Sequence, residues 1–168
     1  MLRVRFVLAL LALLASGCAQ GDPQPVLPPS EPFGVAELTL RGPEGDTVGI
    51  PVYVAADSAA RSLGLMDRDE LPAGTGMVFL FPSERAGPFY MYRTRIPLSI
   101  AFYGAGGRVL SVLDMEPCTS QDPAACERYD PGVPYAGALE VNQGFFAERG
   151  IGEGWTVELP SDLPSPGA

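Results

Sequence analysis

The chain of 168 residues contains no histidine and no lysine, so all 11 of its basic residues are arginine. Without histidine the chain cannot form a Ser-His-Asp or Cys-His nucleophilic site, an HExxH zinc site or an imidazole acid or base. Without lysine it cannot form a Schiff base or a phosphate-binding P-loop. Carboxylates, hydroxyls and arginines remain for catalysis, and no spacing among them predicts a catalytic set, a metal site or a cofactor.

Cysteine is also scarce, with only three residues in the chain. Cys118 and Cys126 are separated by a short stretch of loop-type residues, and neither a CxxC spacing nor further soft ligands accompany them. In a protein exported to an oxidising compartment, such a pair predicts a disulfide rather than a redox or metal site.

Positive charge is in short supply, because 20 acidic residues stand against 11 basic ones and give a formal charge of −9. A nucleic-acid partner needs clustered positive charge to neutralise its phosphates, so this composition argues against nucleic-acid binding. An acidic domain is also repelled by anionic lipid headgroups. We therefore expect a domain near a membrane to be held on a tether rather than to lie on the surface.

The chain has one long apolar run, residues 6–15, which follows Arg3 and Arg5. The run fits a signal peptide and is too short to cross a hydrocarbon core about 30 Å thick. The segment ASGC after it resembles the lipobox of bacterial lipoproteins, in which the cysteine receives the lipid. We expect a lipoprotein signal peptide at 1–17, lipidation of Cys18, and a membrane-anchored protein on the extracytoplasmic face of the bacterial envelope. The alternative is an ordinary secretory signal in which Cys18 is incidental.

Proline-rich segments flank a region of domain size. Residues 18–33 combine the expected lipidated cysteine with five prolines and almost nothing to bury, which predicts an extended, semi-rigid tether. Residues 161–168 have a similar composition and predict a flexible tail. The region between them, residues 34–160, has a common size for one domain and is large enough for a single core.

Short alternating runs broken by glycine and proline occupy this region, a pattern typical of β-strands. The expected strands are two hairpins, 35–40 with 50–55 and 98–103 with 108–114, together with 76–81, which Pro82 should end, 138–142 and 155–159. A helix is predicted at 58–63 between an N-cap at Asp57 and a stop at Gly64, and a second one follows a possible cap at Asn142. We predict a mostly-β fold, a compact single-domain barrel or sandwich of about seven short strands with two short helices.

Several short motifs occur in a distinctive order. They are GLMDR (64–68), GMVFLF (76–81), FYMYRTRIPLSIAFY (89–103), MEPC (115–118) and ALEVNQGFF (138–146) followed by GIGEGWTV (150–157). This ordered set resembles the DUF192 family, a domain of unknown function, and the resemblance implies a small β-rich domain without implying a reaction. The family usually has Trp, Lys-Asn and Asp in the central motif, where this chain has Tyr90, Tyr92-Arg93 and Ser99. The polar positions that catalysis would most need are therefore changed here.

The central motif is the candidate binding segment, because residues 89–103 combine five aromatic residues with two arginines and a proline. In one interpretation Arg93 or Arg95 pairs with a carboxylate, preferably Glu140, whose lone charge in a strand needs compensation. In the other, these arginines bind an anionic or carbonyl group in a shallow cleft while Tyr90 or a neighbouring tyrosine stacks on a ring.

Arg68 follows the first predicted helix, and its simpler role is to tie the adjacent loop together. The candidate ligand-binding set is Arg68, Tyr90, Arg93, Arg95 and Glu140. The sequence predicts a lipid-anchored envelope protein that serves as a non-catalytic binding or accessory module for a small anionic or glycan ligand, and it identifies no protein partner. The alternative is a carboxylate-dependent hydrolase of envelope glycans, which would need two carboxylates about 5–10 Å apart across an open cleft. A purely structural protein would instead show an exposed apolar patch and no cavity.

Overall fold

The structure is a computed structural model that describes residues 25–28, 30 and 32–167. The expected signal peptide and Cys18 lie outside these residues. Within the described part of the chain, no helix has the length and apolar character needed to cross a membrane.

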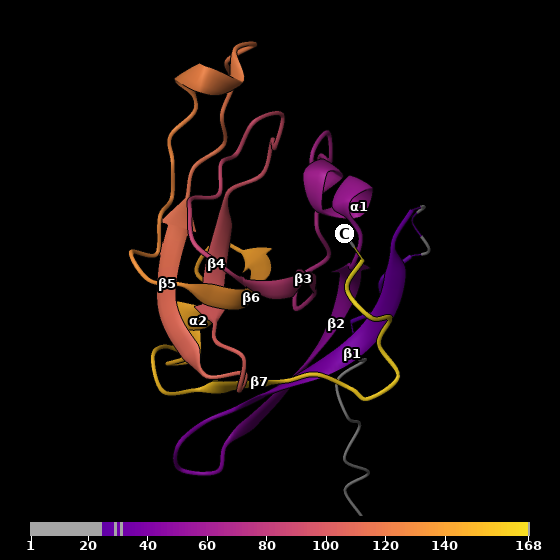
Figure 1. Ribbon diagram of the computed structural model, residues 1–168, viewed down its shortest axis with the longest axis vertical. Helices are drawn as coiled ribbons and strands as arrows, with labels where there is room; N and C mark the ends of the chain where they lie inside the picture. Colours follow the sequence, from indigo (N-terminus) through magenta and orange to yellow (C-terminus); the bar gives the residue numbers. More distant parts are fainter. Residues whose placement is uncertain (1–24, 29, 31, 168) are drawn as a thin grey trace, which may run out of the picture.

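The domain is built on one curled sheet of seven strands in the order β5-β4-β6-β3-β2-β1-β7 (Figure 1). Neighbouring strands are antiparallel except for β2 and β3, which are parallel. The strands are β1 (Gly34–Arg41), β2 (Thr47–Ala55), β3 (Gly76–Arg85), β4 (Leu98–Tyr103), β5 (Val109–Met115), β6 (Tyr135–Asn142) and β7 (Thr156–Glu158). The helices are α1 (Ser58–Leu63), the 3-10 turn Pro123–Ala125 and α2 (Phe145–Glu148). The predicted mostly-β fold with seven strands and two short α-helices is confirmed, in the form of a half-barrel.

The last strand connects the two ends of the curled sheet. β7 pairs with β1, and a further bridge joins Thr156 to Arg108 at the start of β5. The backbone N–H of Val109 donates to the carbonyl of Trp155 at 2.7 Å. In Figure 1 β7 accordingly runs across the bottom of the molecule from the β5 side to β1.

Both faces of the sheet are covered by apolar side chains, because successive residues of a strand point to opposite faces. In β2, Tyr53 and Ala55 belong to one core cluster, whereas Val52 and Val54 belong to the other. The first cluster also contains Ala60 of α1, so we call its side of the sheet the α1 face. The second cluster is completed by both phenylalanines of α2.

Local sequence determines both ends of α1. The Asp57 carboxylate accepts a hydrogen bond from the Ala60 N–H at 2.8 Å, as an N-cap does. Gly64 has a φ of 50° and its N–H donates to the carbonyl of Ala60 at 2.9 Å. The predicted helix and both of its boundary residues are confirmed.

Two other predicted boundaries are wrong. β3 does not end at Pro82 but continues to Arg85, because its register with β6 shifts after Leu80 and the proline lies in this irregular part. Asn142 does not cap α2, since it is the last residue of β6 and its side-chain amide donates to the carbonyl of Leu71 at 2.9 Å.

The segments on either side of the domain also contact it. Leu27 and Phe33 are buried in the α1-face cluster, although the sequence predicted almost nothing to bury there, and the Tyr53 hydroxyl donates to the carbonyl of Pro28 at 2.9 Å. At the other end, the N–H of Gly167 donates to the carbonyl of Ala56 at 2.8 Å. Isolated apolar residues among prolines carry no periodicity, so this packing could not be predicted from the sequence.

Candidate functional site

A cavity of about 350 Å³ opens on the α1 face. Its walls come from α1 and the turn that follows it, from the end of β3 and from the loop at 88–94. Glu140 of β6 also lines the cavity, and it is the only carboxylate that does so among residues 25–28, 30 and 32–167. Cavities of this size are typical of sites for small molecules.

The position of Glu140 follows from the strand alternation. Leu139 and Val141 on either side belong to the other core cluster, so Glu140 points to the α1 face. There it lies opposite Met77 of β3 and Ile100 of β4, both fully buried. A single carboxylate therefore lies in the middle of an otherwise apolar face of the sheet.

The Glu140 side chain has no charged partner among the described residues. It is 5% exposed and takes part in none of the ion pairs formed in residues 25–167 that the structure describes. Burial raises the pKa of Glu140 to about 8, because an apolar environment disfavours the charged form. The carboxyl is thus mostly protonated at neutral pH, where it can both donate and accept a hydrogen bond.

Four aromatic side chains line the cavity, namely Phe79, Phe81, Phe89 and Tyr90. The Phe89 ring packs edge-on against Phe79 and Phe81, with centroid separations of 5.2 and 6.5 Å. It also contacts Phe102 in the same way at 5.5 Å. This interlocked arrangement fixes the orientation of the rings and makes the wall a preformed surface.

Two arginines line the cavity, and they differ in their other contacts. Arg61 of α1 donates to the carbonyl oxygens of Ala56 and Gly167 at 2.7 and 2.9 Å, and so holds the backbone together. Arg85 lies with its guanidinium carbon 4.8 Å from the centroid of Phe81 and takes part in no ion pair within the described residues. Arg85 also acts on the Tyr135 hydroxyl, whose pKa it lowers against the larger effect of burial, and of the two arginines Arg61 alone is held by backbone carbonyls among the described residues.

The segment 89–97 is a loop rather than a regular strand. Arg93 has a φ of 56°, in the left-handed region, which interrupts the alternation that a strand would show. Strand alternation would place Met91 on the face of Arg93 and Arg95, but Met91 is buried while both arginines are exposed. Thr94 and Ile96 point inward with Met91.

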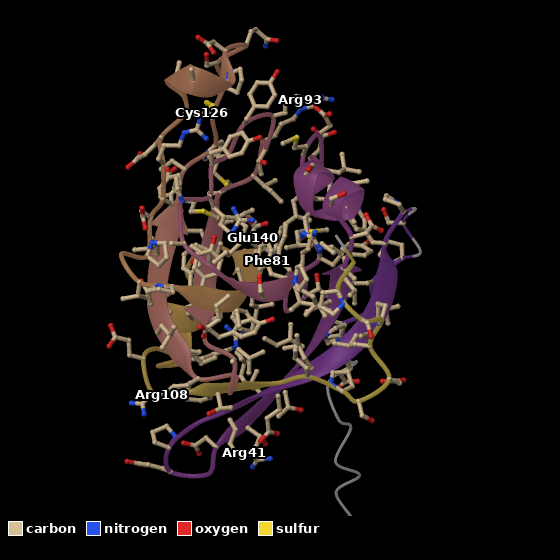
Figure 2. All side chains as sticks on the ribbon, in the orientation of Figure 1. Arg41, Phe81, Arg93, Arg108, Cys126 and Glu140 are labelled. Atoms are coloured by element: carbon tan, nitrogen blue, oxygen red, sulfur yellow. A yellow bond between two sulfur atoms is a disulfide. The ribbon has the colours of Figure 1, made fainter. Side chains whose placement is uncertain are left out.

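The ion pair between Glu140 and Arg93 or Arg95 that the sequence favoured is not formed. Arg93 pairs with Asp67, and Nη1 of Arg95 lies 2.8 Å from Oδ1 of Asp69. Because of the left-handed turn at Arg93, both side chains point away from the cavity toward the loop after α1. In Figure 2, Arg93 lies near the tip of the molecule, well separated from Glu140 at its centre.

Replacing Arg93 and Arg95 by alanine should lower the melting temperature by less than about 3 °C, since exposed ion pairs contribute little to stability. The side chains are 53% and 56% exposed. Arg149→Ala, which removes another exposed pair, is the matched control in a thermal denaturation series. A loss of ten degrees or so in the double variant would show that the two pairs hold the fold together.

The candidate residues thus divide into two groups. Tyr90 and Glu140 line the cavity, whereas Arg93 and Arg95 brace the loop beside it. Arg68 lies outside the lining, with its guanidinium carbon 4.4 Å from the centroid of Tyr53. It also donates to the hydroxyl of Ser30 at 2.5 Å and so ties the N-terminal segment to the domain, a role close to the simpler one expected for it.

The sequence missed most of the lining. The lining residues outside the candidate segment and Glu140 come from α1 and the turn after it, Arg61 among them, and from the end of β3 and the following loop, namely Phe79, Phe81, Arg85 and Pro88. The phenylalanines read as ordinary strand residues, and Arg85 lies beyond the proline at which the strand was expected to end. The one usable signal was the clustering of aromatic residues before and after 82–88.

The predicted disulfide is confirmed, with Cys118 and Cys126 joined and their Cα atoms 5.6 Å apart. It closes a small ring in the long connection between β5 and β6. In Figure 1 this connection projects beyond the sheet beside the loop that follows β3.

The disulfide-bearing connection supports the aromatic wall of the cavity. Phe89 and Tyr129 exchange backbone hydrogen bonds at 3.0 and 2.9 Å, and the Arg128 guanidinium lies 4.6 Å from the centroid of Tyr90. Tyr92 forms a further bridge to Cys118. The disulfide therefore restrains the segment against which Phe89 and Tyr90 rest.

Reduction of Cys118–Cys126 should destabilise the protein by about 2.5 kcal/mol, because a ring of this size restricts the unfolded chain to that extent. For a domain of this length the melting temperature would fall by roughly 8 °C. Calorimetry with and without reductant measures the shift, and a Cys118→Ala/Cys126→Ala variant should not respond to reductant. Equal melting temperatures, with both thiols shown to be free after reduction, would contradict this expectation.

The comparisons with known proteins agree on a family. The model of the DUF192 family, described as Uncharacterized ACR, matches residues 41–159. No curated protein matches the chain. Among solved structures, a "putative transcription regulator" from Sinorhizobium meliloti 1021 is 27% identical, with a TM-score of 0.68 over 75% of this chain and 94% of that one. A protein of unknown function from Novosphingobium aromaticivorans DSM 12444 is 30% identical, with a TM-score of 0.68 over 82% and 94%.

Proposed function

Because the chain belongs to the DUF192 family, whose description assigns no reaction, we propose its function from the cavity: it is a binding module that holds a small ligand on the α1 face. The observation that carries this proposal is a cavity of about 350 Å³ that combines four aromatic side chains with one buried, unpaired carboxyl at Glu140. Apolar walls with a few converging polar groups are the usual composition of ligand sites.

Binding is favoured over glycan hydrolysis by the number of carboxylates. Hydrolysis of a glycosidic bond commonly uses two carboxyl groups on opposite sides of the bond. Glu140 is the only carboxylate among the lining residues, and the nearby Asp67 and Asp69 are engaged by arginines. A ligand can therefore be held here, while the second carboxyl that the reaction needs is not supplied by the lining.

One similar structure is described as a transcription regulator, but the charge of this chain does not favour DNA binding. The chain has a formal charge of −9, and the two arginines of the lining face a cavity rather than forming an extended basic surface. Contact with a phosphate backbone depends on clustered positive charge. A small molecule is the better match to the site.

Loss of the cavity's polar groups should weaken ligand binding without unfolding the protein. In a thermal-shift screen of the purified protein against amines, anionic metabolites and glycans, a ligand of this site should raise the melting temperature of the wild type. The shift should shrink in Glu140→Gln and in Tyr90→Ala, because both side chains line the cavity. Arg41→Ala is the matched control, since Arg41 pairs with Glu158 at the opposite end of the molecule (Figure 2). A shift that is equal in all variants would place the binding site elsewhere.

We further propose that a lipid on Cys18 anchors this binding module at the bacterial envelope. The support is the lipobox-like sequence together with the Cys118–Cys126 disulfide, a bond that persists in oxidising compartments. Two or three acyl chains would anchor it stably. Cys18→Ser should therefore move the protein from the membrane fraction to the soluble fraction in a fractionation experiment. Full retention of the variant on membranes would refute lipidation at Cys18.

A further inference from the structure

Glu140 has no positively charged partner among the described residues, although arginines lie in the neighbouring segment. Its strand neighbours are Met77 and Ile100, and both arginines of the candidate segment are paired with Asp67 and Asp69 instead. A buried carboxylate without a partner is costly, so such groups in proteins are usually paired. In the empty cavity protonation relieves this cost, and a positive charge that stabilises the ionised carboxylate would have to enter through the cavity.

The aromatic walls suit a cation. The negative face of an aromatic ring attracts a cationic group within about 6 Å of its centroid. Phe81 already has the guanidinium carbons of Arg61 and Arg85 at 5.5 and 4.8 Å, and Tyr90 has that of Arg128 at 4.6 Å. Among the described residues no arginine lies over Phe79 or Phe89, so these two rings remain for a cation brought by a ligand.

We propose that the ligand of this cavity presents a positively charged nitrogen, as a protonated amine or a quaternary ammonium, to the carboxylate of Glu140. This inference rests on the proposed function, because it names the ligand class for the same cavity. The carboxylate supplies the opposite charge, and the rings of Phe79 and Phe89 supply apolar and cation-attracting contact. The chain's formal charge of −9 attracts cationic ligands over anionic ones at long range.

The charges around Glu140 limit how such a ligand can lie. Arg61 reaches the cavity from α1 and Arg85 from β3, and no other charged side chain lines it in the part of the chain that the structure describes. Arg61 is held by backbone carbonyls, and Arg85 lies on Phe81. Their positive charge repels a cationic nitrogen, so the nitrogen should lie at the Glu140 end of the cavity.

Binding of a cation also requires Glu140 to lose its proton to solvent. Each bound ligand therefore releases up to one proton, and affinity rises with pH until the carboxyl is ionised in the free protein. A neutral or anionic ligand that accepts a hydrogen bond from the protonated carboxyl shows the reverse dependence. The sign of the pH dependence thus separates the two classes of ligand without any mutation.

The test compares four probes that share one ring: benzyltrimethylammonium, benzylamine, benzyl alcohol and benzoate. Isothermal titration of the purified protein is carried out at about pH 6 and about pH 8.5, on either side of the Glu140 pKa of about 8. We expect the two cations to bind and the other two probes to bind at least tenfold more weakly. We expect the affinity for benzyltrimethylammonium, whose charge is constant, to be at least tenfold higher at the higher pH.

Two variants and one control complete the experiment. Glu140→Gln should abolish the pH dependence and most of the cation binding, and Tyr90→Ala, an exposed position that folding tolerates, should weaken it several-fold. Arg41→Ala should bind as the wild type does. Tighter binding of benzoate or benzyl alcohol, with loss in Tyr90→Ala, would overturn the cationic class while leaving the cavity a ligand site. Cation binding that is unchanged in Glu140→Gln, or no binding of either cation at about 10 mM, would overturn the inference as well.

Discussion

Between about pH 5 and about pH 8, the wild-type protein should lose several kilocalories per mole of stability relative to a Glu140→Gln variant. The pKa of Glu140 is raised from 4.5 to about 8 by burial. In this range the folded protein holds a proton that the unfolded chain has released, so raising the pH favours unfolding. The contribution of the protonated Glu140 to stability is fully present below its pKa in the unfolded chain, and it is lost as the pH rises through its pKa in the folded protein. At about 1.4 kcal/mol per pKa unit, the difference is on the order of 4 kcal/mol.

Urea denaturation of both proteins across this pH range measures the effect, because the pH dependence of all other groups is shared and cancels in the difference. Glu158→Gln is a control whose stability difference from the wild type should stay flat over this range and change only at lower pH. Arg41 lowers the pKa of Glu158, so the stability from that pair is present above the ordinary pKa and is lost as the pH falls. Parallel curves for the wild type and Glu140→Gln would mean that Glu140 is solvated in solution.

Gly76→Ala should destabilise the fold by about 3 kcal/mol, the upper part of the usual range for overpacking. A Cβ at this position would lie 2.5 Å from the backbone oxygen of Glu140 and 3.0 Å from Cγ1 of Val141. Gly76 is held between Val141 of β6 on one side and Val52 of β2 on the other, so neither strand can move aside without breaking a ladder. Gly76 therefore allows the close approach that brings Glu140 to its place.

Gly34→Ala is the matched control, because Gly34 also begins a strand and a Cβ there would meet nothing within 4 Å. Chemical denaturation followed by circular dichroism compares the three proteins. A Gly76→Ala variant within about 0.5 kcal/mol of the wild type would mean that β3 and β6 can separate locally at no cost.

The strands and α1 were predictable because their signals are local. Asp57 and Gly64 mark the ends of α1 by chemistry that acts within one helical turn, and alternation is visible in each strand separately. The boundaries predicted at Pro82 and Asn142 were wrong because tertiary contacts, which the local sequence does not show, determine the structure at both positions. The proline lies where β3 and β6 lose register, and the asparagine bonds to a loop about seventy residues away in the sequence.

For the candidate site, the sequence pointed to Glu140 but predicted the wrong ion-pair partners for it. A lone charge inside the strand ALEVN made Glu140 a candidate, and the structure places it in the cavity lining. Its pairing with Arg93 or Arg95 assumed a regular strand, and one left-handed residue is enough to turn both side chains away. Arg61 and Arg85 could not be assigned, because they meet at the cavity only through the crossover that brings α1 beside the end of β3.

The pairing of β7 with β1 has a consequence for the order in which the chain can fold. The register joins Leu40 to Val157 and Arg41 to Thr156, more than a hundred residues apart in the sequence. Contacts of such high sequence separation slow folding, because a long loop must close before they form. A growing chain therefore lacks the strand that closes the sheet until residues 156–158 have emerged, and until then the outer edge of β1 is open to pairing with another chain. The native topology is complete only when β7, near the end of the domain, pairs with β1.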